Sequence, residues 1–409
     1  MSLAADRRPG PPGAAPAVPG RPPLGANGRL RLRATEALGS IQLLDFVVGA
    51  LLIVRTAVPF VPFPLPVSDT AMLAFTAWAC FRRPRHRAPQ IAWFGVVWLL
   101  MLVYLVGVSS LQDIDFARRG LRIAALILFA LFIAQGRVHL PSLAAGLLTA
   151  LTVNVPLFYL RIAPDDYGGV LTGYLADKNV AGLYYSVFAL FLLGVVRSRR
   201  ARIAIVLIGL VFVFLTGSRT STAGYVFGLL WLYGTAAMPL LFRLGAAGGV
   251  VWLFSYLEEN FARVGPFADR AGSDHLRERI DAATQAKVSV TPWYGQGLGE
   301  ATVYMEGNDW FFHNAYLGLF VEGGFPFLVV VLALVLWVMF LSRRTPLRTF
   351  QRRSLEACGF AMVLSADRLG EVFISIPAFV LFGYGLLLMV REEREGIREA
   401  GPQRMGVLL

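Results

Sequence analysis

The sequence has little charge, few histidines and almost no cysteine. Only 16% of its 409 residues are charged, four are histidines and two are cysteines. Cys358 lies inside an apolar run, and Cys80 ends another beside a basic cluster. Two cysteines placed in this way exclude a disulfide framework and a cysteine-based metal site. The chemistry of the chain must therefore depend on a small number of polar groups.

Apolar residues dominate instead. They make up 56% of the chain, and the mean hydropathy is +0.61, which is typical of a protein that has the bilayer as its solvent. The net charge of +12 does not indicate nucleic acid, because the arginines fall in short clusters between apolar runs. Such clusters are topology signals, and they are enriched in cytoplasmic loops.

Hydropathy predicts an all-α polytopic membrane protein of about twelve transmembrane helices, with one long periplasmic loop that contains short helices. The predicted spans are residues 41–61, 67–81, 90–109, 121–136, 140–160, 179–196, 202–217, 221–241, 245–257, 313–341, 354–366 and 369–390. A cytoplasmic N-terminus then places six arginine clusters on the cytoplasmic side. Arg118 and Arg119 are the main exception.

The same topology divides the chain into five parts. Residues 1–35 are expected to be a disordered cytoplasmic tail without a cleavable signal peptide. Residues 36–257 would hold nine transmembrane helices, 258–312 a periplasmic loop with the catalytic groups, and 313–392 three further helices. Residues 393–409 would form a cytoplasmic C-terminal tail. Both termini are thus expected on the cytoplasmic side.

The long loop contains two recognisable segments. Residues 273–287 have apolar side chains at helical spacing with charged residues between them, and predict a helix. Residues 292–299 (Pro-Trp-Tyr-Gly-Gln-Gly-Leu-Gly) predict a turn-rich loop. The loop arginines Arg263, Arg270, Arg277 and Arg279 are compatible with an ordinary solvated surface, or with a positive field at the outer mouth.

His313 stands where this polar loop meets a long apolar run. An imidazole at a bilayer surface can serve as a proton acceptor, although a hydrogen-bonded histidine at a helix start is the ordinary alternative. Asn314 would either orient a ligand or cap the helix. Glu322, inside the run, is expected to have a mainly structural role with a polar partner on another helix, and Gly323-Gly324 predict a kink or close approach there.

Two further polar stretches interrupt the apolar runs. Residues 217–221 (Gly-Ser-Arg-Thr-Ser) are either a tight turn or an anion site, in which Ser218 and backbone N–H groups approach a ligand and Arg219 supplies a forked donor. Lys178 and Asn179 follow Asp177 at the mouth of a predicted span, where an interfacial helix cap is the alternative to a binding role.

These stretches occur in an order that resembles the O-antigen ligase and polymerase superfamily. Residues 173–182 resemble its D/H-K-N-x-x-G segment, and residues 217–221 resemble its G-S-R-[TGS] turn. Residues 273–277 followed by 292–299 are similar to its S-x-x-x-R … P-x-x-G-x-G-x-G loop. His313-Asn314 with Glu322-Gly323-Gly324 resembles its H-N-x-x-L … E-x-G motif. The resemblance extends over about residues 170–330.

The resemblance implies a metal-independent, inverting glycosyltransferase without a cofactor, at the periplasmic face of the bacterial inner membrane. The donor would be a glycan on undecaprenyl diphosphate, and the acceptor a sugar hydroxyl of lipid A–core in lipopolysaccharide biosynthesis. His313 would be the general base, and Arg219 with Arg277 or Arg279 would bind the diphosphate. Ser218, Lys178, Asn179, Asn314 and Glu322 would support the site.

Other functions remain open on the sequence. An O-antigen polymerase or a protein O-oligosaccharyltransferase of the same superfamily would share these motifs. A polytopic transporter or flippase of lipid-linked glycan is the alternative from another class, for which paired broken helices would be the signature. In each case the partners are lipid-linked glycan and membrane lipid, and no nucleic acid is expected.

Overall fold

The structure is a computed structural model. It describes residues 41–57, 65–86, 88–235, 238–239, 242–243, 245–246, 248–250, 252–253, 256, 271–341 and 349–399. The predicted tail at 1–35 and the loop arginines Arg263 and Arg270 lie outside the described residues. All contacts below belong to the unit that spans Gln42–Leu409.

Helices form most of this unit. The first half contains α2 (Leu43–Leu51), α3 (Val67–Ala79), η1 (Pro89–Ile91), α4 (Ala92–Leu111), α5 (Ala117–Ala134), α6 (Leu140–Tyr159), η2 (Gly173–Leu175), α7 (Lys178–Val195), α8 (Arg199–Leu215) and α9 (Arg219–Gly234). The second half contains α11 (Ala271–Ser289), β1 (Thr302–Met305), β2 (Asn308–Phe311), α12 (Ala315–Val335), the π-helical η4 (Leu336–Leu341), α13 (Phe350–Ser365) and α14 (Ile376–Glu399). The all-α prediction is confirmed except for the short hairpin.

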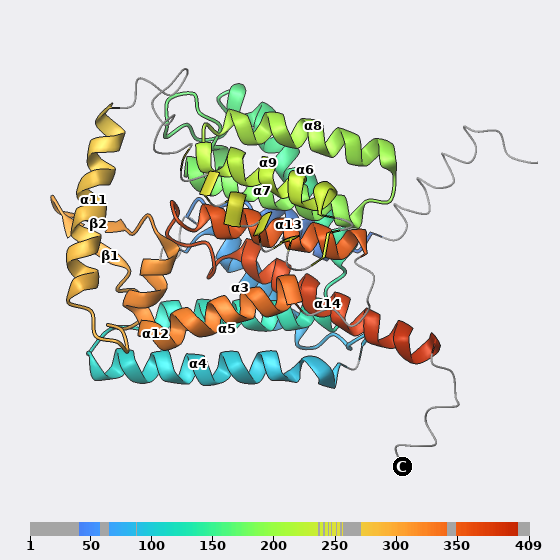
Figure 1. Cartoon of the computed structure of the whole chain (residues 1–409), viewed down its shortest axis with the longest axis horizontal. Helices are drawn as coiled ribbons and strands as arrows, with labels where there is room; N and C mark the ends of the chain where they lie inside the picture. The colour runs from blue at the N-terminus through green and yellow to red at the C-terminus, as the bar shows by residue number, and fades with distance from the viewer. Residues whose placement is uncertain are drawn as a thin grey trace, which may run out of the picture. The chain divides into compact units, whose positions relative to one another are not determined.

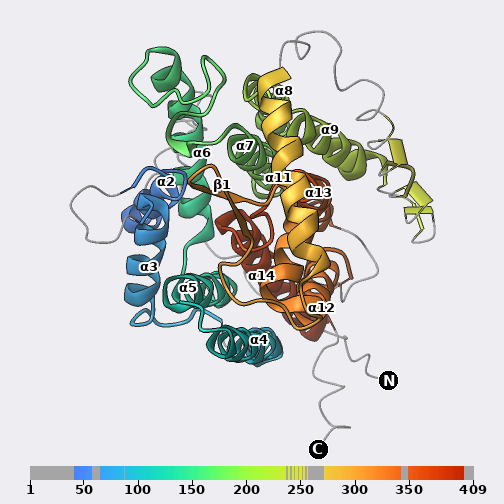
Figure 2. The same ribbon diagram turned by 90° about the vertical axis from the view of Figure 1, so that its left-hand side faces the viewer.

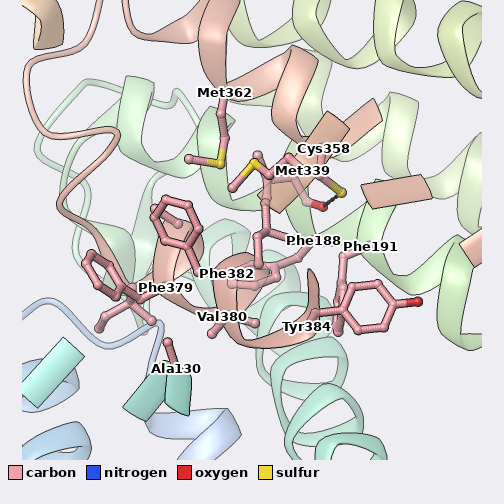
Figure 3. Close-up of a cluster of buried hydrophobic side chains, with 14 of the residues drawn as sticks. Ala130, Phe188, Phe191, Met339, Cys358, Met362, Phe379, Val380, Phe382 and Tyr384 are labelled. Atoms are coloured by element: carbon pink, nitrogen blue, oxygen red, sulfur yellow. Dashed lines mark hydrogen bonds between the residues drawn. The ribbon is translucent and has the colours of Figure 1, made fainter. Parts of the chain in front are cut away.

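The core lies where α7, α13, α14 and α5 meet. Most residues of α7 are buried, and aromatic rings from α7 and α14 fill the space between the helices (Figure 3). Phe191 and Tyr384 pack edge to face with ring centroids 5.1 Å apart. Cys358 is buried in α13 and donates its Sγ–H to the carbonyl of Val187 at 3.4 Å, so it serves as a packing residue.

Four helical segments in the described ranges are long and apolar enough to cross a bilayer. They are Pro89–Leu111, Leu140–Tyr159, Lys178–Val195 and Ala315–Leu341, and each matches a predicted span. These helices support a membrane protein, but the prediction of about twelve spans is not matched. Hydropathy alone also counted segments whose helices are short or carry charge. Residues 41–61 contain only the nine-residue α2, and α13 carries the buried Arg352 and Glu356.

The boundaries of the last helix also correct the sequence analysis. Residues 366–375 form an irregular segment, so the span predicted at 369–390 begins only at Ile376. The helix then continues to Glu399, which places the first residues of the predicted C-terminal tail inside α14. Asp45, for which the sequence offers no partner, is paired: both its carboxylate oxygens bind Arg82, at 2.9 and 2.7 Å.

The predicted helix of the long loop is confirmed as α11. Figure 1 shows α11 running steeply across the direction of α4, α5 and α8, and Figure 2 shows it over the ends of the other helices. The hairpin of β1 and β2 pairs Thr302 with Phe311 in antiparallel register. Together with α12, these elements enclose a small second core that contains Ile280, Val303 and Phe312. This core attaches α11 to the segment that carries His313.

Candidate functional site

His313 lies between β2 and α12, and Asp281 of α11 faces it. Its Nδ1 is 3.6 Å from Asp281 Oδ1, and that nitrogen is buried without a hydrogen-bond partner. The His313 side chain is nevertheless 27% exposed, so part of the side chain can be reached from outside. A carboxylate beside one imidazole nitrogen can orient the ring and leave the second nitrogen to act as a base.

His313 and Asp281 line a cavity of about 230 Å³. The other lining residues are Thr284, Gln285, Asn314, Leu317, Asp367 and Arg368. The wall is therefore polar on most sides and combines two carboxylates, a guanidinium and an imidazole. Such a cavity suits a hydroxylated or charged ligand better than an apolar one.

Asn314 caps α12, which begins at Ala315 and not at His313 as predicted. Its Oδ1 accepts the backbone N–H groups of Tyr316 and Leu317 at 3.0 and 3.1 Å. Its Nδ2 donates to Asp367 at Oδ1, 3.0 Å, and at the backbone carbonyl, 3.3 Å. The sequence left two roles open for Asn314, and the structure confirms the helix cap. The same side chain also binds the 366–375 segment through Asp367.

The glycine-spaced loop at 292–299 pairs with a break in α12. Gly323 and Gly324 have non-helical backbone angles, and Gly324 has φ +65°, which confirms the predicted kink. The freed backbone groups of α12 bind the loop: Phe325 N–H donates to Trp293 O at 2.8 Å. In return, Gln296 N–H donates to Val321 O at 2.7 Å. The break is thus satisfied by protein, as irregular backbone inside a membrane protein must be.

Glycine is required at this contact for space as well as for φ. A Cβ on Gly324 would lie 1.9 Å from Trp293 O, and a Cβ on Gly295 would lie 2.6 Å from the amide nitrogen of Gly324. Gly295 itself has φ +92°. The two glycine motifs recognised separately in the sequence therefore form one packed unit.

Glu322, directly before the break, pairs with Arg119 of α5. Arg119 Nε is 2.6 Å from Glu322 Oε1, which also accepts the N–H of Gly299 at 3.1 Å. The expectation of a structural carboxylate with a partner on another helix is confirmed. The pair also explains why Arg119 departs from the positive-inside pattern, because its charge is used inside the protein.

Arg119 belongs to a longer chain of ion pairs. Its Nη1 is 2.5 Å from Glu371 Oε1, and Arg122 joins Glu371 Oε2 to Asp69 of α3, each at 3.2 Å. Burial raises the pKa of Glu371, but the guanidinium groups of Arg122 and Arg119 outweigh burial and hold that pKa below its ordinary value. Glu371 therefore remains charged and keeps α5 tied to the segment before α14.

The structure separates the two arginines of α11 that the sequence left equivalent. Arg279 is exposed and binds Glu306 in the hairpin turn at 2.7 Å. Arg277 is half-buried and lies close enough to Tyr167, in the loop before α7, to influence its titration electrostatically. Arg277 also lies four residues before Asp281, so both are on one face of α11, about 6 Å apart along its axis. Arg277 is therefore the less exposed arginine of this helix.

Tyr167 connects Arg277 to the first motif. Its hydroxyl donates to Asp177 Oδ2 at 2.5 Å, and Lys178 Nζ lies 5.5 Å from the centre of its ring. Burial, followed by the bond to Asp177, raises the pKa of Tyr167, so the phenol stays protonated. Asp177 also caps α7 by accepting the N–H groups of Asn179 and Val180 at 2.8 and 2.9 Å. The cap predicted at this helix start is confirmed.

The glycine of the first motif also contacts the serine turn of the second. A Cβ on Gly182 of α7 would lie 2.4 Å from Ser221 Oγ. Ser218 caps α9: its Oγ accepts the N–H of Ser221 at 3.4 Å and donates to Ser221 Oγ at 2.9 Å. Gly217, with φ +59°, makes the turn. These contacts place Arg219, the first residue of α9, beside α7.

Four predicted elements thus form two contacting groups. The His313 motif packs with the glycine loop and α11, whereas the Lys178 motif packs with the serine turn. Among the described residues, the lining of the His313 cavity includes neither Arg219 nor Arg277. A shared site for His313 and Arg219 therefore stays a prediction.

Two residues were missed as members of the site. Asp281 had a usable signal, since it follows Arg277 at the i+4 spacing of one helix face. Arg119 also had a usable signal in the sequence, because it is a cation on the predicted outer side and a predicted span contains a carboxylate. The sequence does not show which residues on different elements pair, and so it did not predict the pairs Arg119–Glu322 and Asp281–His313.

The sequence matches no protein-family model and no curated protein. The likeness to the O-antigen ligase and polymerase superfamily therefore rests on the order of the four motifs in this chain.

Proposed function

We propose that this protein is a glycosyltransferase of the O-antigen ligase type in the bacterial inner membrane. It moves a glycan from undecaprenyl diphosphate to a sugar hydroxyl of lipid A–core, at a site that faces the periplasm. The observation that carries the proposal is the His313–Asp281 pair, with Nδ1 beside the carboxylate and both side chains lining a polar cavity. The order of the motifs supplies the substrate class.

The chemistry needs one base and one site of positive charge. The acceptor hydroxyl oxygen forms a bond to the anomeric carbon, and its proton passes to Nε2 of His313. The bond from that carbon to the diphosphate oxygen breaks, and the electron pair leaves with the diphosphate. Because the diphosphate is already a stable anion, no general acid is required. One displacement of this kind inverts the anomeric centre.

Asp281 assists the base in two ways. A carboxylate at Nδ1 favours the tautomer that keeps Nε2 unprotonated, and it stabilises the imidazolium after proton transfer. The 3.6 Å separation is longer than a hydrogen bond. Catalytic hydrogen bonds are often long in the absence of substrate and shorten in the reactive complex, so this distance is compatible with the role.

Positive charge for the diphosphate would come from the side of α11 that carries Arg277. The neighbouring Lys178 and the protonated phenol of Tyr167 belong to the same cluster. A guanidinium offers a planar, permanently charged fork that fits phosphate oxygens. Arg279 has a different role, since it binds Glu306 in the hairpin. Arg219 at the start of α9 is proposed as the second cation, together with the N-terminal N–H groups of that helix.

The test uses the full chain in detergent, with a polyprenyl-diphosphate-linked glycan as donor. Lipid A–core is the first acceptor, and the lipid-linked repeat itself is the second. Transfer to lipid A–core supports the ligase, whereas extension of the lipid-linked repeat identifies the polymerase alternative. Absence of both reactions in an intact, folded preparation would contradict the proposal.

Transport is the second candidate, and one observation favours it: α12 is broken within an apolar segment. Broken helices form substrate sites in transporters when their free backbone groups face the ligand. Here the 292–299 loop binds those groups. Glycan transfer in detergent, where no second compartment exists, separates the two functions, because a transporter would form no glycosidic bond.

A further inference from the structure

His313 is fixed by its neighbours on both sides, and both neighbours bind the same segment. On one side, a Cβ on Gly370 would lie 1.9 Å from Phe312 O, so residues 366–371 pass directly against the strand end. On the other side, Asn314 donates to Asp367, and Ala315 N–H donates to Ala366 O at 2.7 Å. The position of His313 therefore depends on where this segment lies.

The segment is in turn held by Arg119. Glu371 Oε1 accepts a hydrogen bond from Arg119 Nη1 at 2.5 Å, and Glu371 directly follows the residues that pack on Phe312 and Asn314. The exposed fractions of the two side chains are 18% and 24%, so water does little to weaken the pair. Arg122 adds a second contact to Glu371 from the same helix.

The other end of the His313 region is held by the same guanidinium. Glu322 lies two turns into α12, where its Oε1 lies 2.6 Å from Arg119 Nε and accepts the N–H of Gly299. Only the first two turns of α12 separate Glu322 from the Asn314 cap. One arginine therefore ties α5 to the helix after His313, to the glycine loop, and to the segment that clamps both neighbours of His313.

We propose that Arg119 is a positioning residue that sets the direction of the His313 ring by joining Glu322 to Glu371. The expected effect on catalysis rests on the proposed function, whereas the effect on the position of the His313 ring does not depend on it. The planar guanidinium of arginine can contact two carboxylates through two different nitrogens, whereas the ammonium of lysine has one nitrogen and acts as a point charge. Lysine at position 119 should therefore keep one contact and lose the other.

The experiment compares Arg119→Lys and Arg119→Gln with the wild type in two assays. The first measures kcat and the donor KM for glycan transfer. A misplacement of about 1 Å remote from the chemistry can reduce a rate by about 10²-fold. We expect Arg119→Gln to lower kcat by about this factor, Arg119→Lys by about 10-fold, and the donor KM to change little.

The second assay needs no substrate. It measures the rate at which diethyl pyrocarbonate modifies His313, resolved by mass spectrometry, with His86 on another part of the chain as internal reference. Both variants should change the rate at His313 and leave that at His86 unchanged. Glu371→Gln, which removes the carboxylate charge that faces Arg119 and Arg122 without altering the sequence of α5, should change the His313 rate in the same direction.

The matched control is Arg352→Lys, which alters another buried pair. Arg352 Nε binds Glu392 at 2.7 Å, with exposed side-chain fractions of 5% and 7%. It should leave both kcat and the His313 modification rate unchanged. Equal effects of Arg352→Lys and Arg119→Lys would overturn the inference, since the response would then be general destabilisation.

The failures of the two proposals are distinguishable. If the wild type forms no glycosidic bond but the His313 modification rate responds to Arg119, the proposed function is wrong and the positioning role holds. If transfer requires His313 but neither kcat nor the modification rate responds to Arg119→Gln, the positioning role is wrong and the function holds.

Discussion

Asp281 Oδ1 lies 3.6 Å from His313 Nδ1 and joins α11 to the segment that leads into α12. Asp281 lies near the middle of the long loop and His313 directly after it, and the small core of Ile280, Val303 and Phe312 holds the two segments together. A carboxylate next to one imidazole nitrogen leaves the other as the reactive one. The site proposed here depends on this relationship.

Replacement of Asp281 by asparagine should therefore reduce transfer without loss of protein. The variant keeps the shape of the side chain but removes the charge that stabilises the imidazolium, so we expect kcat to fall about 10²-fold. The measurement is steady-state transfer by purified protein. Glu306→Gln in the neighbouring hairpin is the control, because Glu306 contacts Arg279 of α11 and not His313. Equal rates for Asp281→Asn and the wild type would remove Asp281 from the site.

The two arginines of α11 should differ in their effect on the donor. Arg277→Ala should raise the donor KM and lower kcat/KM about 10²-fold, because Arg277 is half-buried and interacts electrostatically with Tyr167, as the proposed diphosphate site requires. Arg279→Ala should change kcat/KM little, since its partner Glu306 and its own side chain are both exposed. Donor titrations of both variants provide the comparison. A larger effect of Arg279→Ala than of Arg277→Ala would contradict this assignment and indicate that the diphosphate binds on the Arg279 side of α11.

The glycine contact at the break of α12 should be essential for stability. Gly324→Ala combines a positive φ with a Cβ that would lie 1.9 Å from Trp293 O, so we expect a loss of about 3 kcal/mol or more. Gly168 has a similar φ of +64° but open space around its Cβ position, and Gly168→Ala should cost only about 1–2 kcal/mol. Denaturation in detergent compares the two. Similar losses would show that the loop and α12 are not in close contact.

The free energy of unfolding should also depend on pH, because Glu371 titrates at a different pH in the folded and unfolded chain. Because its pKa is lowered in the folded protein by Arg122 and Arg119, the unfolded chain takes up the proton first as the pH falls. The stabilisation is fully present above the ordinary glutamate pKa of 4.5 and is lost progressively below it, towards the lowered pKa of the folded state. Unfolding midpoints of the wild type and Glu371→Gln should converge below about pH 4.5. A constant difference down to pH 3 would contradict the assignment.

Local signals in the sequence predicted the elements that depend on neighbouring residues. Residues 273–287 have helical periodicity and form α11, and the glycine pair at 323–324 breaks α12 as expected. Asn314 and Asp177 cap their helices because a short side-chain acceptor at the first turn satisfies N–H groups that no other residue can reach.

Features that depend on residues distant in sequence could not be predicted in the same way. Hydropathy counted twelve spans because it cannot separate a lipid-facing run from one buried in protein, and α13 has buried charges that only its neighbours satisfy. The pairing of Arg119 with Glu322 crosses from α5 to α12, and that of Asp281 with His313 crosses the loop. The hairpin of β1 and β2 was also missed, because its strands have only four residues each.

The most direct measurement of the central claim is glycan transfer by His313→Ala in detergent, with lipid-linked donor and lipid A–core acceptor. Loss of a positioned base should lower the rate about 10²–10⁴-fold, while His86→Ala retains wild-type transfer and both variants unfold at the wild-type temperature. Transfer by His313→Ala at the wild-type rate would contradict the account, because no reaction could then depend on the imidazole that Asp281 orients.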